Sequence, residues 1–159
     1  MSLEIRKATE NDTDAILGLI MGIAEYEKLT HQVTATDELI RKNMFGETPY
    51  AYCYLAYRNE QLAGYALYFF NYSTFLAKPG LHLEDLFVQP EFRGKGIGKA
   101  LLLTLAKEAN EKDCGRMEWM ALDWNTPAHD FYFSLGAEML PEWELFRATE
   151  NALENLGNA

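Results

Sequence analysis

Apolar and polar residues alternate with two different periods along the chain, and the two periods predict a mixed α/β domain. Residues 3–8 have a period of two, as a short strand would, because apolar Leu3 and Ile5 alternate with charged residues. A period near 3.6 follows, with polar candidates for a helix N-cap before it, and this predicts an amphipathic helix that fades near Lys28. The chain therefore opens with a strand and a helix.

The remaining pattern predicts strands and helices separated by short polar turns. Residues 50–57 and 62–72 are rich in aromatic and aliphatic side chains and indicate a β-hairpin. The other expected elements are a short helix ending at Gly46, a strand at 81–88, a helix at 99–112, a strand at 117–122, a helix at 126–135 that stops at Gly136, and a last strand at 143–148. We expect one domain over residues 1–159, with a tail that frays from Thr149.

Composition narrows the class of protein. The formal charge is −10 and 48% of the 159 residues are hydrophobic, which argues against a disordered chain and against a nucleic-acid binder. No apolar run approaches the ~20 residues that span a bilayer, so we expect a cytoplasmic protein without a membrane partner. Cys53 and Cys114 are expected to be free thiols, and no His/Cys cluster predicts a metal site.

The glycine-studded stretch at residues 81–103 joins an apolar strand to an amphipathic helix. Three glycines at alternate positions, 94, 96 and 98, allow a close backbone approach, and a helix start supplies free N–H groups, so the stretch predicts an anion-binding turn for a phosphate or pyrophosphate. It is not a Walker A loop, because Ala100 follows Gly98-Lys99 and cannot bind magnesium. The Rossmann fingerprint is also a poor match, because Lys99 stands where a glycine belongs.

The ordered set of motifs resembles the GNAT acetyltransferase superfamily. The loop Arg93 to Gly98 has the form R-x-x-G-x-G, and it follows Leu-Glu-Asp-Leu-Phe-Val at 83–88. The opening Ile-Arg-Lys-Ala-Thr at 5–9, the phrases at 24–27 and 143–146, and Trp-Asn-x-Pro at 124–127 followed by Phe131-Tyr132 are similar to the spermidine/spermine (diamine) acetyltransferase branch. The resemblance implies a GNAT fold, with a central, mostly antiparallel, twisted sheet of about six to seven strands flanked by about four helices.

The same resemblance implies acetyl-coenzyme A as the cofactor. The backbone of the strand would hold the pantetheine and polarise the thioester if the strand splays from its neighbour, and the loop would hold the pyrophosphate. Asn125 would contact the pantetheine amides, although a plain helix N-cap explains it equally well. The expected cofactor-binding residues are Leu86, Phe87, Val88, Arg93, Gly94, Lys95, Gly96, Ile97, Gly98, Lys99, Asn125, Thr126, Pro127, Ala128 and Tyr132.

Acetyl transfer to an amine needs two proton transfers. Glu84 is the candidate base because it interrupts an apolar strand, where a carboxylate costs stability unless it is paired or wet; a solvated strand-edge acid is the alternative. Strict alternation turns Asp85 to the other face unless a bulge intervenes, so it is expected to play a supporting role at most. The resemblance makes Tyr132 the acid that protonates the departing sulfur.

The amine is expected to be a small cation: a polyamine, a diamine or a lysine-like amino acid such as thialysine. The resemblance places substrate contacts at Tyr26, Glu27, Glu84, Glu118, Trp119 and Glu142, and ordinary solvated acids are the alternative explanation for the carboxylates. We expect direct attack in a ternary complex with no acyl-enzyme on either cysteine. Two other functions stay open: acetylation of a protein amino group, and a coenzyme-A-binding sensor or interaction module without catalysis. The resemblance also implies a homodimer, with residues 143–148 as an exchanged strand.

Overall fold

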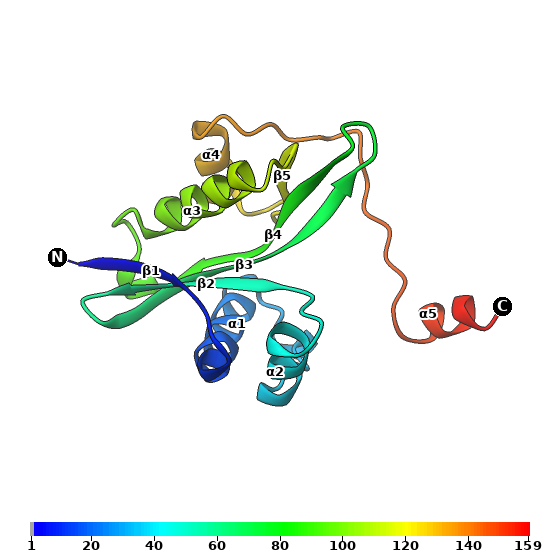
Figure 1. Ribbon diagram of the computed structural model, residues 1–159, viewed down its shortest axis with the longest axis horizontal. Helices are drawn as coiled ribbons and strands as arrows, with labels where there is room; N and C mark the ends of the chain where they lie inside the picture. Colours follow the sequence, from blue (N-terminus) through cyan, green and yellow to red (C-terminus); the bar gives the residue numbers. More distant parts are fainter. Residues whose placement is uncertain (1) are drawn as a thin grey trace. The chain divides into compact units, whose positions relative to one another are not determined.

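The computed structural model describes residues 2–159 and contains a five-stranded sheet with the strand order β1-β2-β3-β4-β5 (Figure 1). The first four strands are antiparallel neighbours, and β5 runs parallel to β4. The strands are β1 (Leu3–Lys7), β2 (Tyr52–Arg58), β3 (Gln61–Ser73), β4 (Lys78–Val88) and β5 (Arg116–Trp119). The expected hairpin is confirmed as β2 and β3, with bounds shifted by one or two residues.

Five α-helices and three short 3₁₀ helices complete the described residues. The α-helices are α1 (Thr13–Glu27), α2 (Asp37–Phe45), α3 (Ile97–Glu111), α4 (Thr126–Ser134) and α5 (Glu150–Gly157), and the 3₁₀ helices are η1 (Glu10–Asp12), η2 (Thr30–Gln32) and η3 (Pro90–Phe92). Contacts divide the chain into one compact unit that ends at Met120 and a second unit from Ala121 to Ala159. The prediction of a single domain therefore stays a prediction. No helix among residues 2–159 is both long and apolar enough to cross a membrane.

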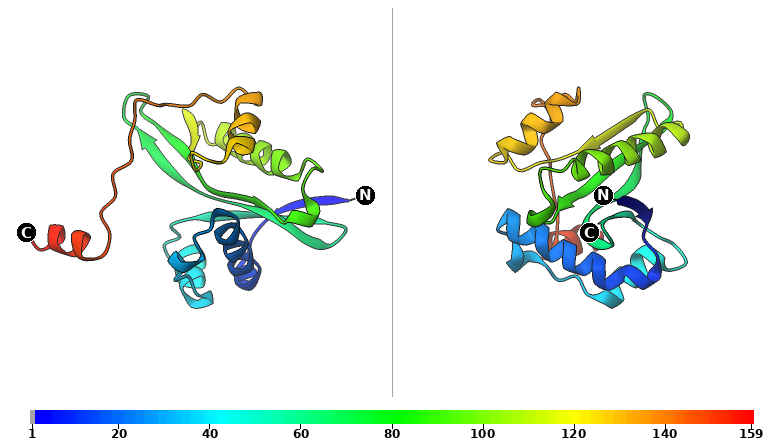
Figure 2. Two further views of the ribbon diagram at one scale, coloured as in Figure 1. Left: turned by 180° about the vertical axis from the view of Figure 1, so that it is seen from behind. Right: turned by 90° about the vertical axis from the view of Figure 1, so that its left-hand side faces the viewer.

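In the first unit, α1 and α2 cover one face of the sheet and α3 covers the other, as the two opposite views show (Figures 1 and 2). α1 ends where the sequence predicts, because Lys28 takes a left-handed conformation with φ 61° and its N–H caps the carbonyls of Ala24 and Glu25. The core on the α1/α2 face combines residues from both helices and three strands: Ile16, Leu19, Ile40, Met44, Cys53, Leu55, Tyr65 and Phe87.

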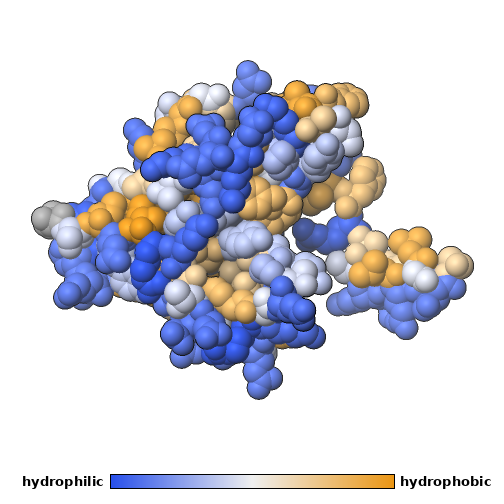
Figure 3. All heavy atoms as spheres, in the orientation of Figure 1, coloured by the Kyte–Doolittle hydropathy of each residue, from blue (hydrophilic) through white to orange (hydrophobic). Residues whose placement is uncertain are grey.

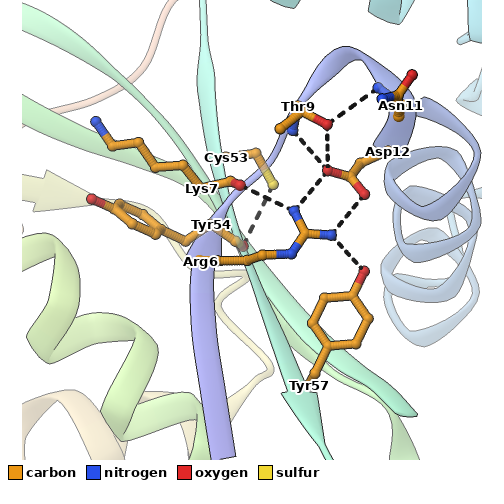
Figure 4. A network of polar contacts seen from close by, with 8 residues as sticks. All are labelled: Arg6, Lys7, Thr9, Asn11, Asp12, Cys53, Tyr54 and Tyr57. Atoms are coloured by element: carbon orange, nitrogen blue, oxygen red, sulfur yellow. Dashed lines mark hydrogen bonds and ion pairs between the residues drawn. The ribbon is translucent and has the colours of Figure 1, made fainter. Parts of the chain in front are cut away.

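A partly buried ion pair fixes the junction between β1 and α1 (Figure 4). The Arg6 guanidinium donates to both carboxylate oxygens of Asp12, at 2.8 and 2.9 Å, and to the Tyr57 hydroxyl at 3.2 Å. The backbone N–H of Thr9 adds a bond of 2.7 Å to Asp12, which completes a capping box at η1. Hydrogen bonding from Arg6 is the main reason that the pKa of Asp12 falls to about 2.

Two sequence expectations are corrected at the carboxyl-terminal end. The sheet has five strands, fewer than the six to seven expected, in part because residues 143–148 form no strand. An alternating segment becomes a strand only where another strand satisfies its N–H and C=O groups, and within its unit this segment has no such partner. The tail that was expected to fray instead forms α5, since Leu153 and Leu156 lie three residues apart on an amphipathic helix.

Candidate active site

A β-bulge in β4 decides which acidic side chain faces α1. Leu67 of β3 pairs with Asp85 and Tyr68 pairs with Leu83, so Glu84 is an extra residue that has no partner on β3. Without the bulge, Asp85 would face the same side of the sheet as buried Leu83. Because the bulge lies between these two residues, Asp85 instead faces the same side as Phe87, which belongs to the core on the α1/α2 face. The bulge that could bring Asp85 into the site is therefore present.

Three carboxylates, Glu27 of α1 with Glu84 and Asp85 of β4, influence one another in this region. Burial raises the pKa of Glu27, and the charges of Asp85 and Glu84 raise it further. Burial also raises the pKa of Asp85, with an added contribution from Glu84 and an opposing one from the Tyr65 hydrogen bond. Within residues 2–159, no lysine or arginine forms an ion pair with any of the three. Such a cluster of like charges favours binding of a cation.

Glu84 itself is accessible. Its side chain is 54% exposed, and its Oε2 lies 3.7 Å from Nε2 of His82 on the same strand. His82 in turn stacks on Phe69 with a centroid separation of 4.7 Å. In this position Glu84 can be reached by water and by a substrate from solvent. The exposure agrees both with the expected role as a base and with a solvated surface acid.

The edge of β4 that faces β5 is open over its second half. β5 pairs only with Gly80 to Leu83, whereas residues 85–88 pair with β3 alone. In an antiparallel ladder about half of the N–H and C=O groups point away from the partner, so this half of β4 presents unpaired backbone groups at its free edge. Within the first unit this free edge is what the expected role of Leu86, Phe87 and Val88 requires, and that role stays a prediction. The side chain of Phe87 is buried in the core, so any contact of this residue with a cofactor is expected from its backbone.

The glycine loop begins at this open end and leads directly into α3. Gly94 and Gly96 have φ values of 74° and 80°, a region that residues with a Cβ rarely adopt, and a Cβ added at either would meet no atom of the described residues within 4 Å. Gly96 is the N-cap of α3 and has no side chain to bond the first-turn N–H groups. The loop thus forms an uncovered cradle of backbone donors at the positive end of a 15-residue helix, which suits an anion.

The two cations of the loop contact the protein itself. Arg93 Nε donates to the Val88 carbonyl at 2.9 Å, and its guanidinium lies over the rings of Tyr26 and Phe87, at 5.1 and 5.4 Å from their centroids. Lys95 Nζ donates to the Glu91 carbonyl at 3.1 Å. Arg93 therefore braces the loop against α1, beside a pocket of about 460 Å³ that residues from α1, β4 and η3 line. The expected pyrophosphate contacts of both side chains stay predictions.

The other predicted site residues fall into both units. Glu118 forms an ion pair of 3.0 Å with Arg116 on β5, and Trp119 lies opposite Leu83. In the second unit, Asn125 is the N-cap of α4, its carbonyl accepting from Ala128 and His129, and Thr126 and Pro127 open the helix. The ring of Tyr132 is tilted by 52° against that of Phe131, with 5.5 Å between the centroids, and Glu142 is exposed. The approach of Tyr132 and Asn125 to a substrate or cofactor remains a prediction.

Neither cysteine is suited to nucleophilic catalysis. Both are free thiols, as expected, and burial raises the pKa of both, which disfavours the thiolate. Among residues 2–159 the structure contains no group of three or more His, Cys, Asp or Glu side chains arranged to hold a metal ion.

One contact of Asp85 was not expected from the sequence. Tyr65 lies in an apolar stretch of β3 and reads as core, yet its hydroxyl donates to Asp85 Oδ2 at 2.6 Å. Asp85 was given only a supporting role because the bulge has no sequence signature of its own. The pairing of a buried tyrosine with an acid two positions before Phe87 becomes visible only when the register of β3 and β4 is known.

The first unit thus combines a mostly antiparallel sheet, a bulge in β4, and a glycine loop whose backbone donors at the start of α3 suit an anion. The chain matches the Acetyltransferase (GNAT) family over residues 13–137, and it belongs to that family. The family resemblance drawn from the sequence is therefore confirmed, and the protein is an acetyltransferase with a mixed α/β GNAT fold.

Two of its curated relatives are named for the small amine that they acetylate. The chain is 40% identical to a thialysine N-epsilon-acetyltransferase of Bos taurus over 163 residues, which cover 96% of this chain and 95% of the relative. It is 32% identical to an L-ornithine N5-acetyltransferase of Arabidopsis thaliana, with 97% and 87% covered. A solved integron cassette protein from the mobile metagenome of V. cholerae superposes with a TM-score of 0.85 and 27% identity, with 100% of this chain and 99% of that chain covered.

Proposed function

We propose that this acetyltransferase moves the acetyl group of acetyl-coenzyme A to a primary amine of a small cationic substrate, and that lysine-like amino acids such as thialysine or ornithine are the favoured acceptors. The observation that carries the proposal is the cluster of Glu27, Glu84 and Asp85, in which each carboxylate lacks a lysine or arginine partner within the described chain. An ammonium group would relieve their repulsion. The names of the thialysine and ornithine relatives support this substrate class.

The residues present fit acetyl-coenzyme A. The loop at 93–98 offers uncovered backbone donors at the start of α3, where a pyrophosphate would bind, and the free edge of β4 at 85–88 offers donors and acceptors to the amides of a pantetheine. When bound, acetyl-coenzyme A would supply an acetyl thioester as the acyl donor, with its thiol as the leaving group. Backbone N–H groups at the free edge would stabilise charge on the carbonyl oxygen.

Proton transfer at the amine falls to the carboxylate cluster. An alkyl ammonium has a pKa of about 10.4 and must lose a proton before its nitrogen can attack. Glu84, exposed at the bulge, takes the proton directly or through water, and Asp85 holds the amine beside it. The raised pKa of Asp85 makes it a stronger base than an ordinary aspartate. Tyr132 donates a proton to the departing sulfur, a role that the family resemblance assigns to it.

We also propose a cytoplasmic homodimer that the carboxyl-terminal segment helps to form. In the second unit, Trp143 and Phe146 are 75% and 90% exposed, and α5 has an apolar side and a polar side (Figure 3). Apolar side chains in this number are normally covered by a partner. Sedimentation equilibrium of the full chain and of a Trp143→Ser/Phe146→Ser double variant tests the idea: we expect a dimer for the first and weakened self-association for the second. A monomeric full chain contradicts the proposal.

An amine panel tests the function. Purified protein and acetyl-coenzyme A are incubated with thialysine, lysine, ornithine, putrescine, spermidine or a lysine-containing peptide, and thiol release is followed. We expect turnover with thialysine or another lysine-like amine, and its loss in Asp85→Asn with coenzyme A binding retained. Turnover of the peptide alone would indicate a protein acetyltransferase, and coenzyme A binding without any turnover would indicate a binding module; either result contradicts the proposal.

A further inference from the structure

The Tyr65 hydroxyl is the one polar group of a ring that is otherwise buried in the core of the first unit. Tyr65 is fully buried among aliphatic and aromatic side chains from α1, α2 and β2. Its hydroxyl donates to Oδ2 of Asp85 at 2.6 Å, a short distance that is typical of a hydrogen bond to a carboxylate. A phenylalanine would fill the same volume without a polar atom, so packing alone does not explain the hydroxyl.

The pairing depends on the bulge. Tyr65 pairs with Phe87 and Leu67 pairs with Asp85, so Tyr65 and Asp85 are diagonal neighbours on the same face of the sheet. Without the extra residue at Glu84, Asp85 would face the same side of the sheet as Leu83, opposite to Tyr65, and could not form this hydrogen bond. The same backbone irregularity therefore brings the acid into the site and gives it a hydrogen-bond donor from β3.

Only one oxygen of Asp85 is used by this contact. The hydrogen bonds of residues 2–159 engage Oδ2, whereas Oδ1 has no partner there and is not among the fully buried unsatisfied atoms. A carboxylate held through one oxygen by a rigid core residue cannot rotate freely, so the direction of its second oxygen is fixed as well. A fixed acceptor costs less ordering when a ligand binds.

We propose that Tyr65 is a positioning residue for the amine: its hydroxyl holds Oδ2 of Asp85, so that Oδ1 is presented to the incoming ammonium group. This inference rests on the proposed function, which supplies the ammonium, and it adds a buried residue of β3 to the machinery. Tyr65 does not touch the substrate; it acts through Asp85.

The charges around the pair favour this arrangement. The groups that face Asp85 are Glu84 on its own strand, Glu27 from α1, Cys53 from β2 and Tyr65 itself. Burial and the charge of Asp85 raise the pKa of Tyr65 well above 10, so its hydroxyl remains a donor over the whole working range of pH. Of the interactions that shift the pKa of Asp85, the hydrogen bond from Tyr65 is the one that favours the ionised form.

The test compares Tyr65→Phe with Tyr57→Phe. Both remove one tyrosine hydroxyl, but the Tyr57 hydroxyl contacts Arg6 at the β1–α1 junction, away from Asp85. Steady-state kinetics with the best amine of the panel are measured from pH 5 to 9, and the Asp85 carboxyl carbon is titrated by NMR without substrate. For Tyr65→Phe we expect a KM for the amine about tenfold higher, an unchanged KM for acetyl-coenzyme A, and an acid limb of kcat/KM shifted up by about one pH unit.

The sign of the shift follows from the hydrogen bond. The hydroxyl favours ionised Asp85, so its removal must raise the pKa of that carboxyl and the midpoint of the acid limb together, and Tyr57→Phe should move neither. An Asp85 titration and an amine KM in Tyr65→Phe that match wild type would overturn the inference. If wild type turns over no amine at all, the proposed function fails; the substrate-free titration then still reports whether Tyr65 controls Asp85.

Discussion

Asp12 and Asp85 are two aspartates of the first unit, and the fold shifts their pKa values in opposite directions. Asp12 receives both terminal nitrogens of Arg6 and the Thr9 N–H, and its pKa falls to about 2. Asp85 receives one tyrosine hydroxyl, stands near two other carboxylates, and has a raised pKa. A fold that needed only stability would pair or neutralise both. The unpaired one therefore marks the place where a cation from outside is expected to bind.

The largest expected effect concerns the unpaired aspartate. Asp85→Asn keeps the size and an acceptor for Tyr65 but removes the charge that the proposed ammonium meets. We expect turnover of a lysine-like amine to fall about 10²- to 10⁴-fold, measured by thiol release, with coenzyme A affinity unchanged by calorimetry. Because ionisation of Asp85 is unfavourable in the fold, stability at pH 7 should not decrease. Wild-type turnover in this variant would remove Asp85 from the site.

Asp12→Asn is the matched substitution at the paired aspartate. It leaves the Arg6 guanidinium without its carboxylate, so the free energy of unfolding should fall by about 1.5–3 kcal/mol. Urea unfolding at pH 7 measures the loss. Turnover per folded molecule should stay within about twofold of wild type, because Asp12 is not part of the proposed site. A variant as stable as wild type would mean that the network in Figure 4 adds little to the fold.

Stability as a function of pH should distinguish the two aspartates. The contribution of Asp12 is complete above its unfolded pKa of about 3.9, and it is lost as pH falls through the folded value of about 2. Ionised Asp85 is a cost that is absent below about pH 3.9 and grows as pH rises to its raised folded pKa. The deficit of Asp12→Asn should therefore close as pH falls below about 3.9, whereas any gain of Asp85→Asn should be absent below about pH 3.9 and appear as pH rises above it. Urea titrations between pH 2.5 and 7 test both windows, and a shared window would contradict the assignment.

The smallest expected effect tests the anion-binding loop. Gly96→Ala places a Cβ at φ 80°, which costs about 1 kcal/mol of strain and disturbs the donors at the start of α3. We expect the Kd for coenzyme A to rise about tenfold, measured by calorimetry, with the KM for the amine little changed. Gly157→Ala in α5, where a Cβ also meets no atom within 4 Å, is the control and should leave the Kd unchanged. Equal values for both variants would exclude the loop as the anion site.

Most of the first unit could be predicted from the sequence because its elements are encoded locally. The alternation of the hairpin, the stripe of α1 with its cap, and the loop glycines before α3 all act within a few residues. The second unit was predicted less well. Residues 143–148 alternate like a strand, but a strand also needs a partner, and no pattern inside the segment tells whether one is available.

The site was only partly predictable for a similar reason. Glu84 and the loop carry sequence signals, a charge in an apolar strand and three spaced glycines. Asp85 and Tyr65 do not, since their meeting depends on one extra residue in the register of β3 and β4. A bulge shifts the parity of every residue beyond it, and neither strand shows from its own pattern where the shift occurs.

The most direct test of the account is the titration of the Asp85 carboxyl group by ¹³C NMR, in the free protein and with saturating thialysine. The account predicts a pKa above the ordinary value of about 3.9 in the free protein, and a lower pKa when the ammonium is bound beside it. A pKa of about 3.9 that thialysine leaves unchanged would contradict the claim that Asp85 binds the ammonium group of the substrate.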